Sequence, residues 1–234
     1  MSSRVESGRE AYWRLSISYR RALLNSLLRG LQPYVRGVVL DVGGEKHSTV
    51  LHPLDHRKTV ERWLYLNVGA ATFPDILADG AGLPLVDASV DTILCLETLE
   101  HVRDPIQVVR EVARVLRPGG TLILSLPFLY RIHSAPHDYW RFTSHQVERM
   151  IREAGIQTVR INQLGRFFTV ICDMVKQVVA EIRSPLLRWC LWGAIALPAG
   201  ILVALEQDGM GERSASLNAY ATGYLVVGIK DNHV

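Results

Sequence analysis

Residues 37–43 read Gly-Val-Val-Leu-Asp-Val-Gly, a short apolar run that ends in an acid and a glycine. A strand that is buried on both faces of a sheet has this continuous apolar pattern, and such strands belong to parallel sheets. The run therefore predicts a buried parallel strand. Further strands are predicted at Trp63–Asn67, Asp75–Asp79, Val90–Leu96 and Thr121–Leu126.

Helix signals separate the predicted strands. Asp104-Pro105 combines an N-cap residue with proline at the first helical position. The turn Arg117–Gly120 then ends this helix and leads into the strand at Thr121. The residues expected to point inward from the helix are Ile106, Val109, Val112, Val115 and Leu116.

The same alternation continues to the end of the chain. Thr143 is expected to cap a helix that ends near Gly155, a strand follows near Thr158–Ile161, and Tyr224–Lys230 reads as a last apolar strand. Strands that alternate with helices predict an α/β fold with a parallel sheet wound on both faces. In such folds the ligand lies beyond the carboxyl ends of the strands.

Composition limits the class of protein. The chain has 234 residues, of which 48% are apolar and 21% charged, so it can bury a core and wholesale disorder is excluded. The three cysteines lie far apart with no Cys-x-x-Cys pair, which excludes a disulfide scaffold and a cysteine zinc site. Arginines interrupt the first thirty residues, unlike a secretory signal peptide. A cytoplasmic location is expected.

The positive charge is concentrated at the N-terminus. Residues 1–36 carry seven arginines and two glutamates, whereas the whole chain has a net charge of only +3. Within this arm, residues 9–30 have a helical apolar face. The basic arm either meets an anionic surface or forms a solvated helix packed on the domain. The face consists of Leu15, Tyr19, Ala22, Leu23 and Leu27.

Polar side chains stand where four of the predicted strands end. These are Asp41, Asn67, Asp79 and Glu97. Glycines follow the first strand, and a residue without a Cβ atom lets a ligand approach the backbone closely. Separated acceptors of this kind suit a ligand that carries amine and hydroxyl groups.

A longer run of motifs resembles a known family, the class I S-adenosylmethionine-dependent methyltransferases. More narrowly, it is similar to the type 11 methyltransferase-domain family. The resemblance covers about residues 37–163, and Tyr224–Lys230 matches the family's final strand. It implies a Rossmann-like, seven-stranded, mostly parallel sheet with helices on both faces. The motifs are Asp79-Gly80-Ala81-Gly82-Leu83-Pro84-Leu85, Ser89-Val90-Asp91, Leu96-Glu97-Thr98-Leu99-Glu100-His101-Val102, Asp104-Pro105, Glu111, Arg114-Val115-Leu116-Arg117-Pro118-Gly119-Gly120 and Pro136-His137-Asp138-Tyr139-Trp140-Arg141-Phe142-Thr143.

The resemblance assigns S-adenosylmethionine as the cofactor and gives roles to single residues. Asp41, Gly43 and Gly44 match the motif that approaches the methionyl part of the cofactor. Asp79, with Gly80 beside it, matches the acid that accepts a hydrogen bond from the adenine amine. Asn67 stands where the family places the ribose-binding acid, and Leu96 and Glu97 match the residues that flank the sulfonium.

Two residues depart from the family pattern. Glu45 occupies the position of the motif's second glycine, where its carboxylate would repel that of the cofactor unless Lys46 or His47 compensates. Asn67 replaces the ribose-binding acid, although an amide still accepts one hydrogen bond and donates another. The alternative to an enzyme is therefore a catalytically degenerate homologue that binds or scaffolds a partner. A nicotinamide dehydrogenase fits less well, since no Gly-x-Gly-x-x-Gly follows the first strand.

The loop after the fifth strand supplies candidates for the chemistry. A general base is needed if the acceptor is a hydroxyl, as O-methylation would require. The candidate bases are His133, His137, Asp138 and His101, and the candidate acceptor-binding residues are Tyr139, Trp140 and Arg141. Structural readings stay open: His101 orienting its loop, Asp138 pairing with Arg141, and the aromatic side chains capping the sheet.

Metal and nucleic acid are not expected as ligands. His52 and His56 have a helical metal-ligand spacing, but Pro53 lies between them and no third ligand is evident, so they read as surface residues. The chain lacks the interleaved aromatic and basic residues of single-strand binders, and nucleic acid is an unlikely partner on this basis. Acceptors among type 11 relatives are small molecules, sugars or lipid-linked compounds.

The chain is expected to comprise a basic helical arm (1–36) and a methyltransferase domain (37–234) that holds an insertion at 165–218. The apolar segment 185–205 of this insertion includes a run without charge, Trp189–Leu205, interrupted by Pro198 and Gly200. A single membrane crossing would part the last strand from its sheet. The segment therefore either packs on the protein or lies in a membrane interface, where Arg183, Arg188 and two tryptophans would meet anionic lipid.

Overall fold

The computed structural model describes residues 15, 17–46, 54, 59–210 and 214–232. The chain divides into two compact units. The sheet unit comprises Gly30–Pro127, Ile132–Asn162 and Tyr224–Val234, and the helical unit comprises Met1–Arg29, Phe128–Arg131 and Gln163–Gly223. Each unit is described by itself.

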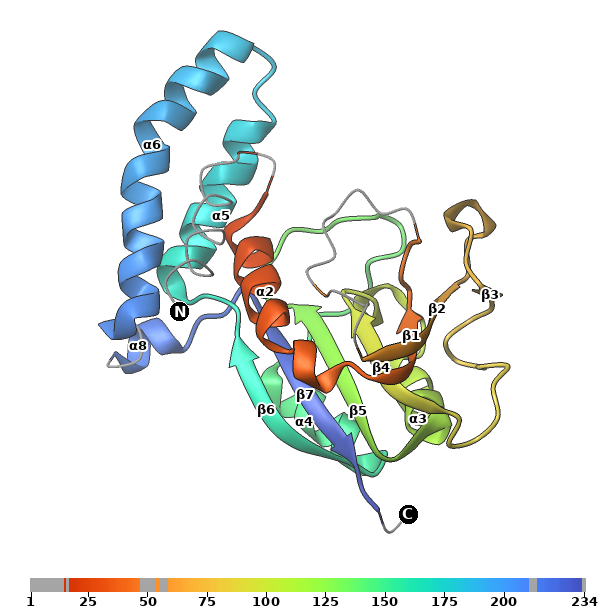
Figure 1. Cartoon of the computed structure of the whole chain (residues 1–234). Helices are drawn as coiled ribbons and strands as arrows, with labels where there is room; N and C mark the ends of the chain where they lie inside the picture. The colour runs from red at the N-terminus through yellow and green to blue at the C-terminus, as the bar shows by residue number, and fades with distance from the viewer. Residues whose placement is uncertain (1–14, 16, 47–53, 55–58, 211–213, 233–234) are drawn as a thin grey trace. The chain divides into compact units, whose positions relative to one another are not determined.

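A seven-stranded sheet forms the framework of the sheet unit, with strand order β3-β2-β1-β4-β5-β7-β6. The pairs β1–β2, β1–β4, β2–β3 and β4–β5 are parallel. Strand β7 runs opposite to its neighbours (Figure 1), so the predicted mostly parallel α/β sheet is confirmed. The strands are β1 (Gly37–Val42), β2 (Val60–Asn67), β3 (Ile76–Leu77), β4 (Val90–Leu96), β5 (Leu116–Pro127), β6 (Ile156–Gln163) and β7 (Gly223–Lys230).

Helices α3 (Pro105–Val115) and α4 (Ser144–Glu153) lie on the same face of the sheet (Figure 1). Both predicted caps are present: Asp104 accepts from the backbone N–H of Gln107, and Thr143 accepts from that of Gln146. Each cap satisfies one N–H group that the first turn leaves without a helical partner.

Two details of the α3 prediction are wrong. Ile106 is 47% exposed, because the buried face of the helix runs through Val108, Val109 and Val112 instead. Leu116 is buried, but it begins β5 rather than ending the helix. The predicted turn at Arg117–Gly120 therefore belongs to an irregular start of that strand, where the register against β4 shifts. Arg117 pairs there with Asp91 across the two strands.

The helical unit contains α2 (Tyr19–Gly30), α5 (Phe167–Ala180), α6 (Pro185–Leu205), the π-helical turn Glu206–Met210 and the short α8 (Ala215–Asn218). The predicted helical insertion is thus present. Pro198 and Gly200 do not interrupt α6, contrary to expectation. The proline removes one backbone hydrogen bond, while Ala196, Ala199 and Val203 around it are buried in the unit's core.

Helix α2 and the insertion form one unit. The buried carboxylate of Asp173 on α5 accepts from the backbone N–H groups of Tyr19 (2.6 Å) and Arg20 (3.0 Å) at the start of α2. Lys176 lies over the rings of Tyr19 and Trp192, and its burial lowers its pKa to about 8. Arm residues 1–14 and 16, which include the first part of the predicted 9–30 helix, lie outside the described residues.

Candidate active site

A cavity of about 420 Å³ lies at the carboxyl ends of β1, β2 and β4, where the fold rule places a ligand. It receives side chains from the strand ends, from the 3₁₀ turn Leu99–His101 and from the loop after β5. Its lining is formed by Val42, Gly43, Leu66, Asn67, Val68, Ala78, Asp79, Gly80, Glu97, Thr98, His101, Val102, Arg103, His137 and Tyr139.

The glycine turn after β1 has no room for side chains. Gly43 has a φ of +81°, and a Cβ atom there would lie 2.5 Å from Oγ1 of Thr98. A Cβ atom on Gly44 would lie 2.4 Å from the carboxyl carbon of Asp41. Asp41 is buried beneath this turn and does not line the cavity, so its position supports the turn from below.

Asn67 also holds the glycine turn. Its amide nitrogen donates to the carbonyl oxygens of Gly43 (3.2 Å) and Gly44 (3.4 Å), and its Oδ1 accepts from the backbone N–H of Gly69 (3.0 Å). Both amide hydrogens are therefore engaged with the chain itself. The amide oxygen keeps one further acceptor site for a ligand.

Two carboxylates reach the cavity from the other strand ends. Asp79 is exposed, and its Oδ1 accepts from the backbone N–H of Ala81 (2.9 Å). Glu97 has a φ of +55°, and its Oε1 accepts from Oγ of Ser125 (2.9 Å). A non-glycine residue held in the left-handed region is strained, and such strain clusters at functional sites. Leu96, predicted beside the sulfonium, does not line the cavity.

Glu45 is the residue whose carboxylate was predicted to repel that of the cofactor. Glu45 is exposed and does not line the cavity. Lys46, one of the two residues that could compensate for this carboxylate, pairs with Asp75 and lowers the pKa of that acid. His47 lies outside the described residues, as do His52 and His56.

The loop after β5 brings a histidine and a tyrosine to the cavity. His137 and Tyr139 both line it, and Nδ1 of His137 lies 2.9 Å from the hydroxyl of Tyr139. The carbonyl oxygen of His137 lies 2.5 Å from Nδ1 of His101. The backbone N–H of Tyr139 donates to the carbonyl of Glu100 (2.8 Å). These contacts join the loop to the turn after β4.

Three other predicted residues brace this loop instead of lining the cavity. Arg141 donates to both carboxylate oxygens of Asp138, at 2.6 and 2.8 Å, and this pair holds the pKa of Asp138 well below its usual range. A carboxylate held so firmly in its ionised form is a poor proton acceptor, so Asp138 does not suit the role of general base. Trp140 donates its indole N–H to the carbonyl of Val102 (2.9 Å) and stacks on Phe142.

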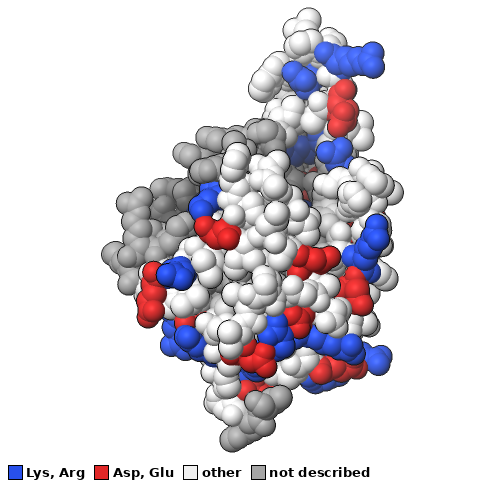
Figure 2. All heavy atoms as spheres, turned by 90° about the vertical axis from the view of Figure 1, so that its right-hand side faces the viewer, with Lys and Arg blue, Asp and Glu red and all other residues white. Residues whose placement is uncertain are grey.

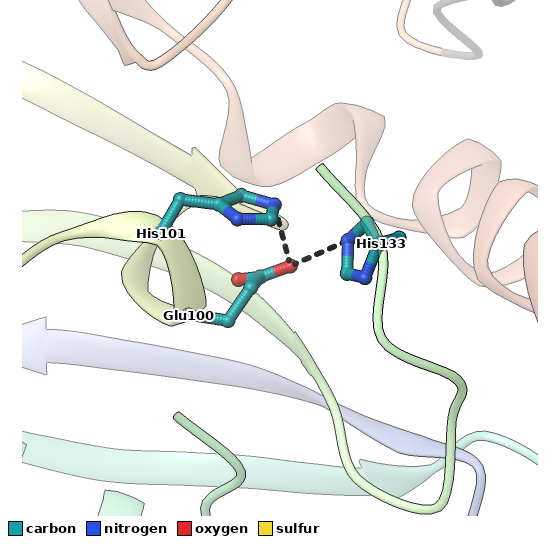
Figure 3. Close-up of side chains that lie close together, drawn as sticks. All are labelled: Glu100, His101 and His133. Carbon is teal, nitrogen blue, oxygen red and sulfur yellow. Dashed lines mark ion pairs between the residues drawn. The ribbon is translucent and has the colours of Figure 1, made fainter. Parts of the chain in front are cut away.

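His133 lies beside a residue that the sequence did not single out for a role. Glu100 is fully buried, and its Oε1 lies 3.6 Å from Nε2 of His101 and 3.8 Å from Nε2 of His133 (Figure 3). Both imidazoles turn toward this carboxylate (Figure 3). Glu100 was missed because an acid in a polar turn usually faces solvent. The adjacent His101 was the only signal in the sequence.

Charges of both signs intermingle on the face that Figure 2 shows, toward which the β2 and β3 edge of the sheet is turned. No field of one sign extends over the described part of this face. Nucleic-acid-binding proteins attract the phosphate backbone with a clustered basic stripe, and the described part of this face lacks such a stripe.

The methyltransferase-domain family model matches residues 55–124, which run from β2 through α3 into β5. The chain is 53% identical over 47 residues to 27-O-demethylrifamycin SV methyltransferase of Amycolatopsis mediterranei, covering 20% of this chain and 17% of that protein. It is 32% identical over 107 residues to a ubiquinone biosynthesis O-methyltransferase of Cupriavidus pinatubonensis, covering 36% and 43%. The matches thus span less than half of these curated relatives.

Solved structures share the whole fold. The complex of the Haloferax volcanii Trm112 methyltransferase activator with a methyltransferase contains a chain that matches with a TM-score of 0.56. The two chains are 19% identical, and the match covers 98% of this chain and 95% of that one. Residues 55–124 are thus similar to a methyltransferase domain, and the chain has the fold of the solved methyltransferase structures.

Proposed function

We propose that the protein is an S-adenosylmethionine-dependent methyltransferase that modifies a hydroxyl of a small-molecule, sugar or lipid-linked acceptor. The observation that carries this proposal is one cavity shared by two groups of residues. Gly43, Asn67, Asp79 and Glu97 line one part, and His101, His137 and Tyr139 come from the acceptor-side segments. The O-methyltransferase relatives support the choice of an oxygen acceptor.

The residues present fit the cofactor. Gly43 lines the cavity, so the glycine turn brings backbone without a side chain to the place where the methionyl part of the cofactor would lie. Asp79 would accept from the adenine amine, Asn67 Oδ1 from a ribose hydroxyl, and Glu97 from the methionyl ammonium. When bound, S-adenosylmethionine supplies a methyl group on a sulfonium, which is a good leaving group.

The protein's own contribution is then positioning and proton transfer. Holding an acceptor oxygen in line with the methyl group supplies most of the acceleration. His137 would take the proton that the hydroxyl loses, while Tyr139, 2.9 Å from its Nδ1, orients the ring. His101 would hold this loop in place through the carbonyl of His137.

Calorimetric titration of the full chain with S-adenosylmethionine tests the proposal. We expect one site per chain, with S-adenosylhomocysteine competing for it. Failure to bind at millimolar cofactor would favour the degenerate, scaffolding homologue. Asn67 supports that alternative, because its amide nitrogen already donates to the carbonyl oxygens of the glycine turn and not to a ligand.

We also propose that the helical unit docks on the surface of an anionic membrane. Pro185–Asp208 is long and apolar enough to cross a membrane, with a mean hydropathy of 1.7, yet only 28% of its apolar window is buried. Packing on α5 accounts for the buried part, including Trp192, which the sequence reading had placed at the interface. Large apolar side chains stand exposed on both helices: Met174, Val178, Leu186, Leu187, Trp189, Leu197 and Ile201.

The charges at one end of the hairpin suit an interfacial position. Arg183 and Arg188 flank the start of α6, beside exposed Leu186, Leu187 and Trp189. Tryptophan and arginine favour the boundary between lipid and water, and basic residues are attracted to anionic headgroups. A helix lying in that boundary buries its apolar face without crossing the bilayer.

A further inference from the structure

The cluster of Glu100, His101 and His133 contains three potential ligand atoms that lie within 4.8 Å of one another. Glu100 and His101 belong to the turn after β4, and His133 reaches them from the loop after β5 (Figure 3). Glu100 is fully buried, and each histidine side chain is about one-quarter exposed. The cluster therefore joins two chain segments at the acceptor side of the sheet.

Each imidazole is oriented through its other ring nitrogen. Nδ1 of His101 lies 2.5 Å from the carbonyl oxygen of His137, which can only accept a hydrogen bond. Nδ1 of His133 lies 3.3 Å from Oδ2 of Asp138, a carboxylate that Arg141 keeps ionised. The first contact favours a proton on Nδ1 of His101 and leaves a lone pair on its Nε2, and the second places the Asp138 carboxylate beside Nδ1 of His133. Metal-binding histidines are oriented in this way by carbonyls and carboxylates.

The spacing of the three atoms is that of ligands around an ion. The separations of 3.6 and 3.8 Å between Nε2 and Glu100 Oε1 are too long for hydrogen bonds. Nitrogen and oxygen ligands about 2.0–2.2 Å from a tetrahedral zinc ion lie roughly 3.3 Å apart. A shift of a few tenths of an ångström would bring these two separations to that value, and all three ligand atoms lie within 4.8 Å of one another. Two histidines and one carboxylate form a recurrent zinc site that keeps an open coordination position.

We propose that Glu100 Oε1, His101 Nε2 and His133 Nε2 bind one divalent transition-metal ion, with Zn²⁺ as the best match to this ligand set. The sequence had predicted no metal site, because only the fold brings His133 to the turn after β4. His101 also lines the cavity, so the ion would lie at its edge. There it would bind the acceptor's hydroxyl oxygen and ease loss of its proton. This role rests on the proposed function, whereas ion binding does not.

Titration of the full, chelator-treated chain with ZnCl₂, without cofactor, tests the site. We expect one ion per chain, and Co²⁺ bound in its place should give the visible absorption of a site with nitrogen and oxygen ligands. His133→Ala should lower Zn²⁺ affinity at least 100-fold. The matched control is His145→Ala, which removes an exposed histidine of α4 and should leave affinity unchanged. Cys190→Ser removes an exposed thiol that would otherwise compete for the ion.

Asp138→Asn provides a second, indirect test. Loss of the carboxylate that faces His133 Nδ1 should lower Zn²⁺ affinity about 10- to 100-fold while the ligands remain. Circular dichroism and thermal melting of each metal-free variant verify that it is folded. Equal Zn²⁺ binding by folded His133→Ala and the unmodified chain would overturn the site, as would preference for Mg²⁺ over Zn²⁺. Zn²⁺ binding without S-adenosylmethionine binding would uphold the ion site and contradict only the proposed methyl transfer.

Discussion

The carbonyl oxygen of His137 lies 2.5 Å from Nδ1 of His101. The backbone of His137, and not its ring, therefore holds His101 in place. The ring of His137 contacts the hydroxyl of Tyr139 instead. Substitution of the His137 side chain therefore separates proton transfer from loop structure.

His137→Ala should lower kcat by about 10²- to 10⁴-fold, the usual contribution of a general base, and leave the Kd for S-adenosylmethionine unchanged. Steady-state kinetics and calorimetry measure the two quantities once an acceptor is in hand. Equal loss of cofactor affinity would place His137 in the cofactor site, and unchanged turnover would remove it from the chemistry.

Asp79→Ala and Asp41→Ala should both weaken cofactor binding. The expected loss is about 1.5–3 kcal/mol, or roughly 10- to 100-fold in Kd, as for a hydrogen bond to a charged group. The two effects have different origins, because Asp79 lines the cavity and Asp41 lies beneath the glycine turn. Asp41→Ala should therefore also lower the Tm, and Asp79→Ala should not. Unchanged calorimetric affinity in Asp79→Ala would contradict its assignment.

Gly43→Ala should disrupt the glycine turn. The new Cβ atom would lie 2.5 Å from Oγ1 of Thr98 in a backbone conformation with φ of +81°, at a cost of about 1–3 kcal/mol. Gly82→Ala is the matched control, since a Cβ atom there meets nothing within 4 Å. Denaturant unfolding and cofactor titration compare the two variants. Equal stability of both would show that the turn yields easily.

The pair between Asp138 and Arg141 makes stability depend on pH. The folded-state pKa of Asp138 lies below the unfolded value of about 3.9, so its contribution is present above that pH and is lost as the pH falls further. At pH 7, Asp138→Asn should lower the free energy of unfolding by about 1.5–3 kcal/mol. The difference from the unmodified chain should shrink in acid. A difference that stays constant between pH 7 and 2.5 would contradict this account.

The double substitution Leu186→Asp and Trp189→Asp should reduce binding to anionic vesicles at least tenfold. Both side chains are exposed, at 76% and 62%, so the folded unit should tolerate the change. Val86→Asp, which alters an exposed residue of the sheet unit, is the control. Co-sedimentation at low and high salt gives the measurement. If the unmodified chain stays in the supernatant and removal of 185–205 unfolds it, the segment is core.

The strands and helix starts were predictable because local signals determine them. The apolar residues Ile93–Leu96 dominate the segment Val90–Leu96, which forms β4 with the predicted bounds. Asp104 and Thr143 cap helices through contacts three residues away. Contacts between distant segments were not predictable: Leu116 pairs with β4, and Pro198 is held within a helix by packing.

The same distinction applies to the candidate site. Asp79 and Glu97 reach the cavity because parallel strands end at one edge of a sheet, which the sequence order already implies. The juxtaposition of Glu100 and His133 depends on the path of the loop after β5. Whether Asp138 and Trp140 brace the loop or contact the acceptor likewise depends on their side-chain partners. The sequence does not show these partners, so both interpretations stayed open.

The capping of α2 by Asp173 has a consequence for synthesis on the ribosome. The carboxylate that receives the N–H groups of Tyr19 and Arg20 is translated about 150 residues after them, when the first six strands have already been made. The nascent chain must therefore carry this amphipathic segment without its partner for most of translation. A growing chain arrested before residue 173 exposes it to chaperones and proteases, so premature termination is expected to yield products that are rapidly degraded.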